Sequence, residues 1–182
     1  ACRLLTLYSG ESIRGVVAGF LDANPAKFAG YLLLPGLEIA SASPETFIER
    51  DGKLIKTSPI KGTRPLGQVG DFPEKDKSEN VMIVDLMRND FGRICVEDSI
   101  KVPNLLEVKD LPGLTHLVSD VVGTLRDGVT WKEIFEATLP PGSVSGAPKI
   151  SAIELINKYE EIDRGPYCGA FGWVHGDRAE LA

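Results

Sequence analysis

The chain has 182 residues, of which 43% are hydrophobic and 25% are charged, and its formal net charge is −6. This composition is sufficient to bury a core, whereas the acidic balance argues against a nucleic-acid-binding protein, which needs a basic face. No apolar run approaches the ~18 residues of a membrane span, and three widely spaced cysteines (Cys2, Cys95 and Cys168) favour reduced thiols in the cytoplasm over a disulfide or zinc framework.

The first predicted element is a helix over residues 12–23, which ends at a turn at residues 24–25. Residues 29–62 then form several short segments with strand character, and the sequence Arg-Asp-Gly-Lys at 50–53 is typical of a tight hairpin. The hydrophobic period changes after this part of the chain, and residues 74–88 are predicted to form a helix.

Strands return over residues 92–111, and the β-branched segment 114–125 predicts one long strand. Two helices are predicted over residues 130–139 and 146–162, and residues 165–181 close the chain with a strand and a turn. Runs of strands separated by runs of helices, without regular βαβ alternation, predict an α+β fold with antiparallel sheet.

Lys61 lies in an unusual setting, the segment "TSPIKGTRPLG", where prolines and a glycine fix the backbone of a turn. Such a lysine is either a solvated turn residue or a nucleophile that points into a pocket. Desolvation or a nearby cation, such as Arg64, favours the neutral amine that a nucleophile needs. Taken alone, the segment is more typical of a solvated turn.

Asp76 and Glu79 are spaced i, i+3 in the predicted helix, so both carboxylates can project from one face. Mg²⁺ usually takes one or two protein carboxylates together with water and substrate oxygens, and this pair could serve as its ligands. The alternative is an ordinary charged pair that faces solvent.

The segment "PPGSVSGAPK", residues 140–149, places small residues directly before a helix, with Ser145 or Gly146 as the expected cap and Pro148 in the first turn. Exposed N–H groups and the helix dipole favour an anion at such a place. Lys149 adds a positive charge there, although a capping loop without a ligand fits the same residues.

Three further residues are weak candidates when each is taken alone. His116 lies inside the predicted long strand, where a buried, hydrogen-bonded histidine is the simpler interpretation. Glu45 follows a proline between strands, where a carboxyl beside a pocket could act as a general acid. Tyr167 precedes glycines that let the backbone approach a ligand closely.

Together these segments resemble the chorismate-utilising enzymes over nearly the whole chain. The blocks that carry the resemblance occur in that family's order: "SPETF", "PIKGTRP", "SENVMIVDLMRNDFGR", "THLVS", "PGSVSGAPKISAIELI" and "GPYCGAFGW". The resemblance implies one catalytic domain over residues 1–182, with two antiparallel β-sheets packed as a sandwich, helices on the outer faces and the active site between the ends of the sheets. It also implies that the family's N-terminal region and C-terminal metal-ligand segment lie outside this chain, so we expect the 182 residues alone to be inactive.

The resemblance further implies roles for individual residues. Glu45 would be the general acid that protonates a departing ring hydroxyl, Lys61 the covalent nucleophile, and His116 a group that orients the substrate or Glu45. Mg²⁺ would be held by Asp76 and Glu79. The residues implied in substrate binding are the Gly146 and Ala147 amides, Lys149, Tyr167 and Thr63.

Lys61 also bears on which branch of the family the chain resembles. Its "PIKGT" is similar to the turn of aminodeoxychorismate synthase component I, whereas anthranilate synthases typically carry alanine in the corresponding "PIAGT". The implied partners are chorismate, ammonia and a glutamine amidotransferase subunit, and the expected location is the cytoplasm. Three alternatives remain open: an anthranilate synthase component I, an isochorismate or salicylate synthase, and a non-catalytic remnant that binds chorismate.

Overall fold

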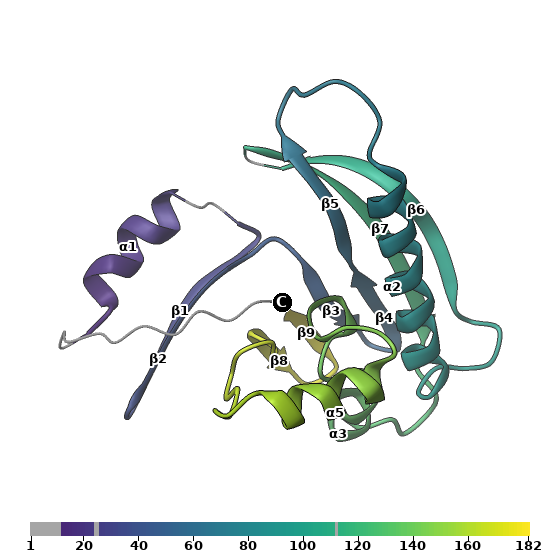
Figure 1. Cartoon of the computed structure of the whole chain (residues 1–182). Helices are drawn as coiled ribbons and strands as arrows, with labels where there is room; N and C mark the ends of the chain where they lie inside the picture. The colour runs from purple at the N-terminus through teal and green to yellow at the C-terminus, as the bar shows by residue number, and fades with distance from the viewer. Residues whose placement is uncertain (1–11, 24–25, 112) are drawn as a thin grey trace.

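A computed structural model of the chain describes residues 12–23, 26–111 and 113–182. They form an α+β fold with two antiparallel sheets, as predicted (Figure 1). The strands are β1 (Phe28–Leu34), β2 (Leu37–Ser43), β3 (Thr46–Asp51), β4 (Leu54–Ser58), β5 (Ile60–Pro65), β6 (Lys101–Leu111), β7 (Leu114–Thr124), β8 (Gly172–His175) and β9 (Arg178–Leu181). The helices are α1 (Arg14–Ala23), α2 (Glu74–Gly92), α3 (Trp131–Thr138), α4 (Gly142–Ser145) and α5 (Lys149–Tyr159).

The larger sheet has seven strands in the order β5-β7-β4-β3-β9-β8, and β6 also pairs with β7. The predicted hairpin at residues 50–53 joins β3 to β4, with Gly52 at φ +61° in its turn. The predicted closing hairpin is formed by β8 and β9, and β9 pairs with β3. The smaller sheet is the two-stranded ribbon β1–β2, which extends to one side of the large sheet together with α1 (Figure 1).

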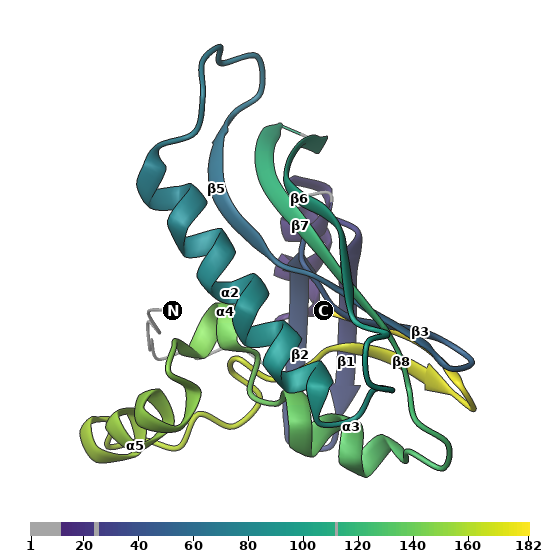
Figure 2. The ribbon, with the colours of Figure 1, turned by 90° about the vertical axis from the view of Figure 1, so that its right-hand side faces the viewer.

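The long strand β7 and the helix α2 form the centre of the molecule. In Figures 1 and 2, α2 runs along β5 and β7 and covers one face of the large sheet. Ile83, Met87 and Phe91 of α2 are almost completely buried and belong to the same core as Val121 of β7. The predicted end of this helix at residue 88 is therefore too early, because the core contacts of α2 continue to Phe91.

One buried side chain fixes the rotation of α2 about its axis. Asn80 is fully buried, and its Nδ2 donates to the Leu117 carbonyl oxygen at 3.0 Å. Its Oδ1 accepts a 2.5 Å bond from the Ser119 hydroxyl, which in turn accepts from the Leu106 N–H. Because strand side chains alternate between the two faces of a sheet, this contact sets which face of β7 lies under the helix.

Asn80→Ala is expected to lower the free energy of unfolding by about 2–4 kcal/mol, because the Ser119 hydroxyl and the Leu117 carbonyl would lose buried partners. Urea denaturation monitored by circular dichroism measures this loss. Ser78→Ala, at an exposed position on the same helix, is the matched control. A loss no larger than that of the control would contradict the anchoring role of Asn80.

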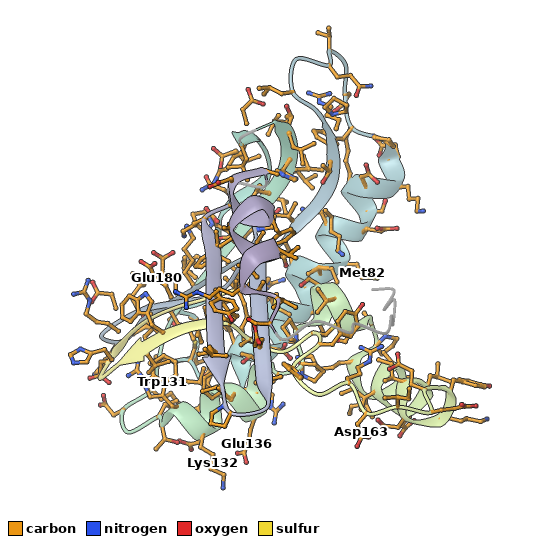
Figure 3. The ribbon with its side chains drawn as sticks, turned by 90° about the vertical axis from the view of Figure 1, so that its left-hand side faces the viewer. Met82, Trp131, Lys132, Glu136, Asp163 and Glu180 are labelled. Atoms are coloured by element: carbon orange, nitrogen blue, oxygen red, sulfur yellow. The ribbon has the colours of Figure 1, made fainter. Side chains whose placement is uncertain are left out.

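Helix α3 packs beside the β8–β9 hairpin. Trp131 of α3 lies beside this hairpin (Figure 3), and its Nε1 donates to the Gly176 carbonyl oxygen at 2.8 Å. The N-terminus of α3 is closed by a capping box between Thr130 and Glu133. The C-terminal hairpin is therefore held on the same core as α2.

Three further predicted boundaries need correction. The segment 92–100 is not a strand, because β6 begins at Lys101 after turns and one isolated bridge. The helix predicted over residues 146–162 is shorter, since α5 starts at Lys149 with Pro148 as its N-cap and without a side-chain cap. Ser145 instead belongs to the short helix α4, which was not predicted.

Two predictions concern residues outside the described ranges: the turn at residues 24–25 and the thiol of Cys2. Among the described cysteines, Cys95 and Cys168 are free thiols, as expected. Within the described ranges, no helix has the length and apolar character needed to span a membrane.

Candidate active site

A single face of α2 positions three segments that come from distant parts of the chain. Asp76 lies against Gly62 of β5, Leu86 lies against Gly142 of α4, and Asp90 is paired with Lys149 at the start of α5. These α2 residues are spaced at helical intervals on one stripe, and Glu79 lies on it as well. The stripe therefore brings residues 61–62 of β5 and the segment 140–149 to the same side of the helix.

Lys61 and Gly62 lie in strand β5 and not in the predicted turn, at a point where the register against β7 shifts. Position 62 needs a glycine for two reasons. Gly62 has φ +84°, in the left-handed region that disfavours other residues. A Cβ at this position would also lie 2.9 Å from the Phe72 ring and 3.1 Å from the Asp76 Cβ. This part of β5 therefore packs closely on the first turn of α2, which fixes the backbone position of Lys61.

Lys61 points toward α4 rather than into solvent. The residue is half-buried, and its Nζ donates a 2.7 Å hydrogen bond to the Ser143 carbonyl oxygen. The position of Ser143 is set by its neighbour Gly142, which contacts Leu86 so closely that a Cβ there would overlap the leucine side chain. The geometry thus differs from that of a solvated turn lysine.

Glu45 lies in the bend between β2 and β3 and faces both Lys61 and Ser143. Burial raises the pKa of the Glu45 carboxyl above its usual value. The neighbouring Ser143 hydroxyl, the positive charge of Lys61 and the backbone N–H of Ile60 lower the pKa and offset part of this rise. A carboxyl with a raised pKa keeps its proton to higher pH, which is the property a general acid requires.

A cavity of about 510 Å³ opens beside this group. Its wall includes Glu45, Ser143 and Tyr167, and the remaining lining residues come from β2, from Phe47 of β3, from Pro141 and Val144, from residues 166–171 and from Ala182. Pockets of this size hold small molecules, with a few polar groups that orient the ligand against a mainly apolar wall. Glu45 and Tyr167 thus line the same cavity.

His116 and Thr63 form a separate pair across β7 and β5. The two residues are register partners, and the Thr63 Oγ1 and His116 Nδ1 atoms are 2.9 Å apart. Burial lowers the pKa of His116, so the imidazole is held in its neutral form. His116 lies on the face of β7 opposite to Ser119 and Val121, which face α2.

Asp76 and Glu79 share the stripe of α2 that faces residues 61–62 of β5. The Asp76 carboxylate lies beside Gly62, and the Glu79 carboxylate is partly exposed, 3.7 Å from the Lys75 ammonium. Within the part of the chain that the structure describes, no three or more His, Cys, Asp or Glu side chains cluster as a metal site. The two carboxylates nevertheless fit Mg²⁺, which usually needs only one or two protein carboxylates besides water and substrate oxygens.

Residues 146–149 make contacts within the protein that differ from the predicted contacts with a ligand. The Gly146 N–H donates to the Gly142 carbonyl oxygen at 3.0 Å and closes α4, so this amide is not directed at a ligand. Ala147 follows it and precedes the N-cap Pro148 of α5. The Lys149 ammonium is mostly buried, 2.5 Å from Asp90 Oδ2 and 3.0 Å from the Thr138 carbonyl oxygen. Its charge therefore neutralises a buried carboxylate in this structure instead of facing the cavity.

Two residues of this region were missed by the sequence interpretation. Ser143 accepts the hydrogen bond from Lys61 and lines the same cavity as Glu45, but within "PPGSVSGAPK" it has no local feature that separates it from Ser145. Asp90 lies far from Lys149 in the sequence, and only the packing of α5 on α2 brings them together. Counting helical positions from Asp76 places Asp90 on the same face of α2. This count does not identify Lys149 as the partner of Asp90.

The comparisons with known proteins identify the family of the chain. Residues 2–182 match the family described as chorismate binding enzyme. The chain belongs to this family.

The relatives carry more than one activity in their names. The chain is 38% identical to anthranilate synthase component 1 of Saccharolobus solfataricus, covering 97% of this chain and 44% of the relative. It is 39% identical to aminodeoxychorismate synthase component 1 of Escherichia coli, covering 96% and 40%. Anthranilate synthase component I from Streptococcus pneumoniae has a solved structure that matches with a TM-score of 0.82 at 32% identity, covering 96% and 40%. The chain thus spans about two fifths of the length of these relatives.

Proposed function

We propose that the protein containing this chain is an aminodeoxychorismate synthase component I, which replaces the 4-hydroxyl of chorismate by an amino group. The observation that carries the proposal is Lys61, which is directed at Ser143 and faces the protonatable carboxyl of Glu45. A lysine amine beside a general acid is what a covalent substitution of a hydroxyl needs. Chorismate, with its carboxylates and ring hydroxyl, would occupy the adjacent cavity.

The proposed substitution takes two steps. In the first, the Lys61 amine forms a bond to a ring carbon, the conjugated double bonds shift, and the C4–oxygen bond breaks. Glu45 gives its proton to this oxygen, which leaves as water, because hydroxide is a poor leaving group. In the second step, ammonia attacks C4, the double bonds shift back, and the carbon–nitrogen bond to Lys61 breaks. The proton lost by the ammonia nitrogen passes to solvent, and one difficult substitution becomes two easier ones.

Asp76 and Glu79 are the residues that would hold Mg²⁺. When bound, this ion would neutralise a substrate carboxylate and polarise the ring system. Tyr167 lines the cavity and would contact the substrate directly. Thr63 and His116 would act as a hydrogen-bonded pair, in which the neutral imidazole orients a neighbouring group without adding charge.

Ammonia would come from a glutamine amidotransferase subunit, in the cytoplasm. This part of the proposal is supported by relatives whose names identify them as component 1 of a synthase. Mixing the full-length protein with a candidate amidotransferase and measuring glutamine-dependent turnover tests it. Equal activity with glutamine alone, in the absence of the second subunit, would contradict the need for this partner.

The second candidate is an anthranilate synthase component I, and it is favoured by relatives of nearly the same identity. The two functions use the same substrate and ammonia but differ in whether pyruvate is eliminated. Lys61 favours the first function, because the elimination route does not need a covalent lysine. The product formed from chorismate, Mg²⁺ and ammonium decides between them.

Glu45→Gln is expected to reduce kcat/KM for chorismate by about 10²–10⁴-fold, since the departing oxygen would lose its proton donor. The sign of the pH effect follows from the raised pKa of Glu45. Wild-type activity should hold while the carboxyl is protonated and fall as the pH rises through this pKa. A pH profile of kcat/KM measures both effects, and an unchanged alkaline limb in the variant would contradict the assignment.

A further inference from the structure

We infer that Phe171 limits the size of the ligand in the candidate substrate cavity, an inference that rests on the proposed binding of chorismate there. Two cavities of the structure meet at this residue. One is the cavity of about 510 Å³ that Glu45 lines, and the other has a volume of about 290 Å³. The smaller cavity is lined by residues 27–29 and 172–173 and by Glu180, besides Phe171. Among the described residues, Phe171 is the only one that lines both cavities.

The Phe171 ring lies directly against the backbone of β1. A Cβ atom at Gly30 would lie only 2.7 Å from the Cε1 atom and 3.1 Å from the Cζ atom of this ring. The register partner of Gly30 in β2 is Ser41, which lines the larger cavity. The glycine therefore lets the ring pack on the β1–β2 ribbon at the place where the two cavities meet.

The backbone of Phe171 is fixed as well as its ring. Its N–H donates to the Ala182 carbonyl oxygen at 2.9 Å, and its carbonyl oxygen accepts from the Ala182 N–H at 2.8 Å. At Gly172, the next residue, a Cβ atom would overlap the Glu180 carbonyl oxygen, so β8 and β9 approach each other closely. Backbone and ring contacts together hold Phe171 between the cavities.

An aromatic ring in this place has a steric consequence for the ligand. It closes the side of the larger cavity that faces the smaller one, and it offers an apolar surface to a ligand with one ring. Without the ring the two cavities would join, and a longer ligand could bury its far end in the smaller cavity. Phe171 should therefore favour carboxylates with one ring over longer ones.

The test measures the binding of benzoate and of biphenyl-4-carboxylate to the full-length protein by isothermal titration calorimetry. In Phe171→Ala, the dissociation constant of the biphenyl compound relative to that of benzoate should fall at least about tenfold, because the second ring gains a place to be buried. Phe171→Leu keeps a large apolar side chain and should leave this ratio within about threefold of wild type. Tyr159→Ala, which removes an exposed aromatic side chain from α5, is the matched control.

The ratio distinguishes a limit on ligand size from a structural role, since a damaged fold would weaken the binding of both compounds. An unchanged ratio in Phe171→Ala, or an equal fall in Tyr159→Ala, would overturn the inference. A wild-type protein that binds neither compound, in the absence and presence of the Phe171→Ala change, would overturn it as well.

Gly30→Ala tests the contact that holds the ring. A ring displaced by the new Cβ atom either narrows the larger cavity or leaves its wall, so benzoate should bind at least about threefold more weakly. The same substitution made in Phe171→Ala should have no effect, because the ring that it displaces is absent. Gly19→Ala on α1, where a Cβ atom would have no neighbour within 4 Å, is the control. An equal loss with and without the Phe171 ring would contradict the role of this contact.

These binding measurements separate the inference from the proposed function. A wild-type protein that makes anthranilate, or no product, refutes the proposed function, while the ratio of the two dissociation constants can still be measured. If the protein aminates chorismate, Phe171→Ala should raise KM about fivefold or more and change kcat less than about threefold, because the ring contacts the substrate away from the reacting atoms. A fall in kcat without a change in KM would overturn the inference.

Discussion

Lys61→Ala is expected to reduce the formation of 4-amino-4-deoxychorismate by at least about 10³-fold in the full-length protein. The amine would be the group that bonds to the ring in the first step, and neither alanine nor solvent water can replace it. Chorismate binding should be affected far less, because Lys61 does not line the cavity and bonds instead to the Ser143 carbonyl. Steady-state kinetics with ammonium, with the product identified by mass spectrometry, measures this loss.

The same variant has a second expected outcome. Without a covalent lysine, the remaining groups still hold chorismate and a general acid, so the residual product should shift toward anthranilate. Lys132→Ala, at a highly exposed lysine on α3, is the control for a loss of positive charge without a loss of the nucleophile. Wild-type rates of aminodeoxychorismate formation in Lys61→Ala would contradict the covalent role.

Lys149→Met is expected to destabilise the fold by about 3–5 kcal/mol, because it leaves the Asp90 carboxylate buried without its partner. The Lys149 and Asp90 side chains are only 13% and 5% exposed, and the ammonium also binds the Thr138 carbonyl. Loss of this pair should release the start of α5 from α2. Urea denaturation at neutral pH measures the change.

Two further variants make the Lys149 prediction specific. Lys158→Met changes an exposed lysine on the same helix and should alter stability by less than about 0.5 kcal/mol. Replacing both partners, as Lys149→Met with Asp90→Leu, should recover most of the lost stability, because no unpaired charge is then buried. Equal destabilisation by Lys149→Met and Lys158→Met would contradict a structural role for the pair.

Much of the fold could be predicted from local patterns. The long strand β7 follows from its β-branched residues, and the β3–β4 hairpin from the residues of its turn. The start of α2 at Glu74 follows from the change of period. Its end could not be predicted in the same way, because Phe91 extends the helix through core contacts that only the tertiary structure supplies.

The site was harder to predict, because its residues become partners through the packing of α2. Lys61 and Glu45 stand in segments with distinctive turn residues, which is why the sequence singled them out. Lys149 was predicted to bind an anion because the sequence indicates that it lies at the start of a helix. The sequence does not indicate that Asp90 is its buried partner. The helix α4 was not predicted, because its four residues are too few to show a helical period of hydrophobic residues.

The central claim is that Lys61 enables this protein to aminate chorismate at C4. The most direct test is to incubate the full-length wild-type protein with chorismate, Mg²⁺ and ammonium and to identify the product by mass spectrometry. The expected product is 4-amino-4-deoxychorismate, with all carbons of chorismate retained. Anthranilate together with released pyruvate would contradict the claim.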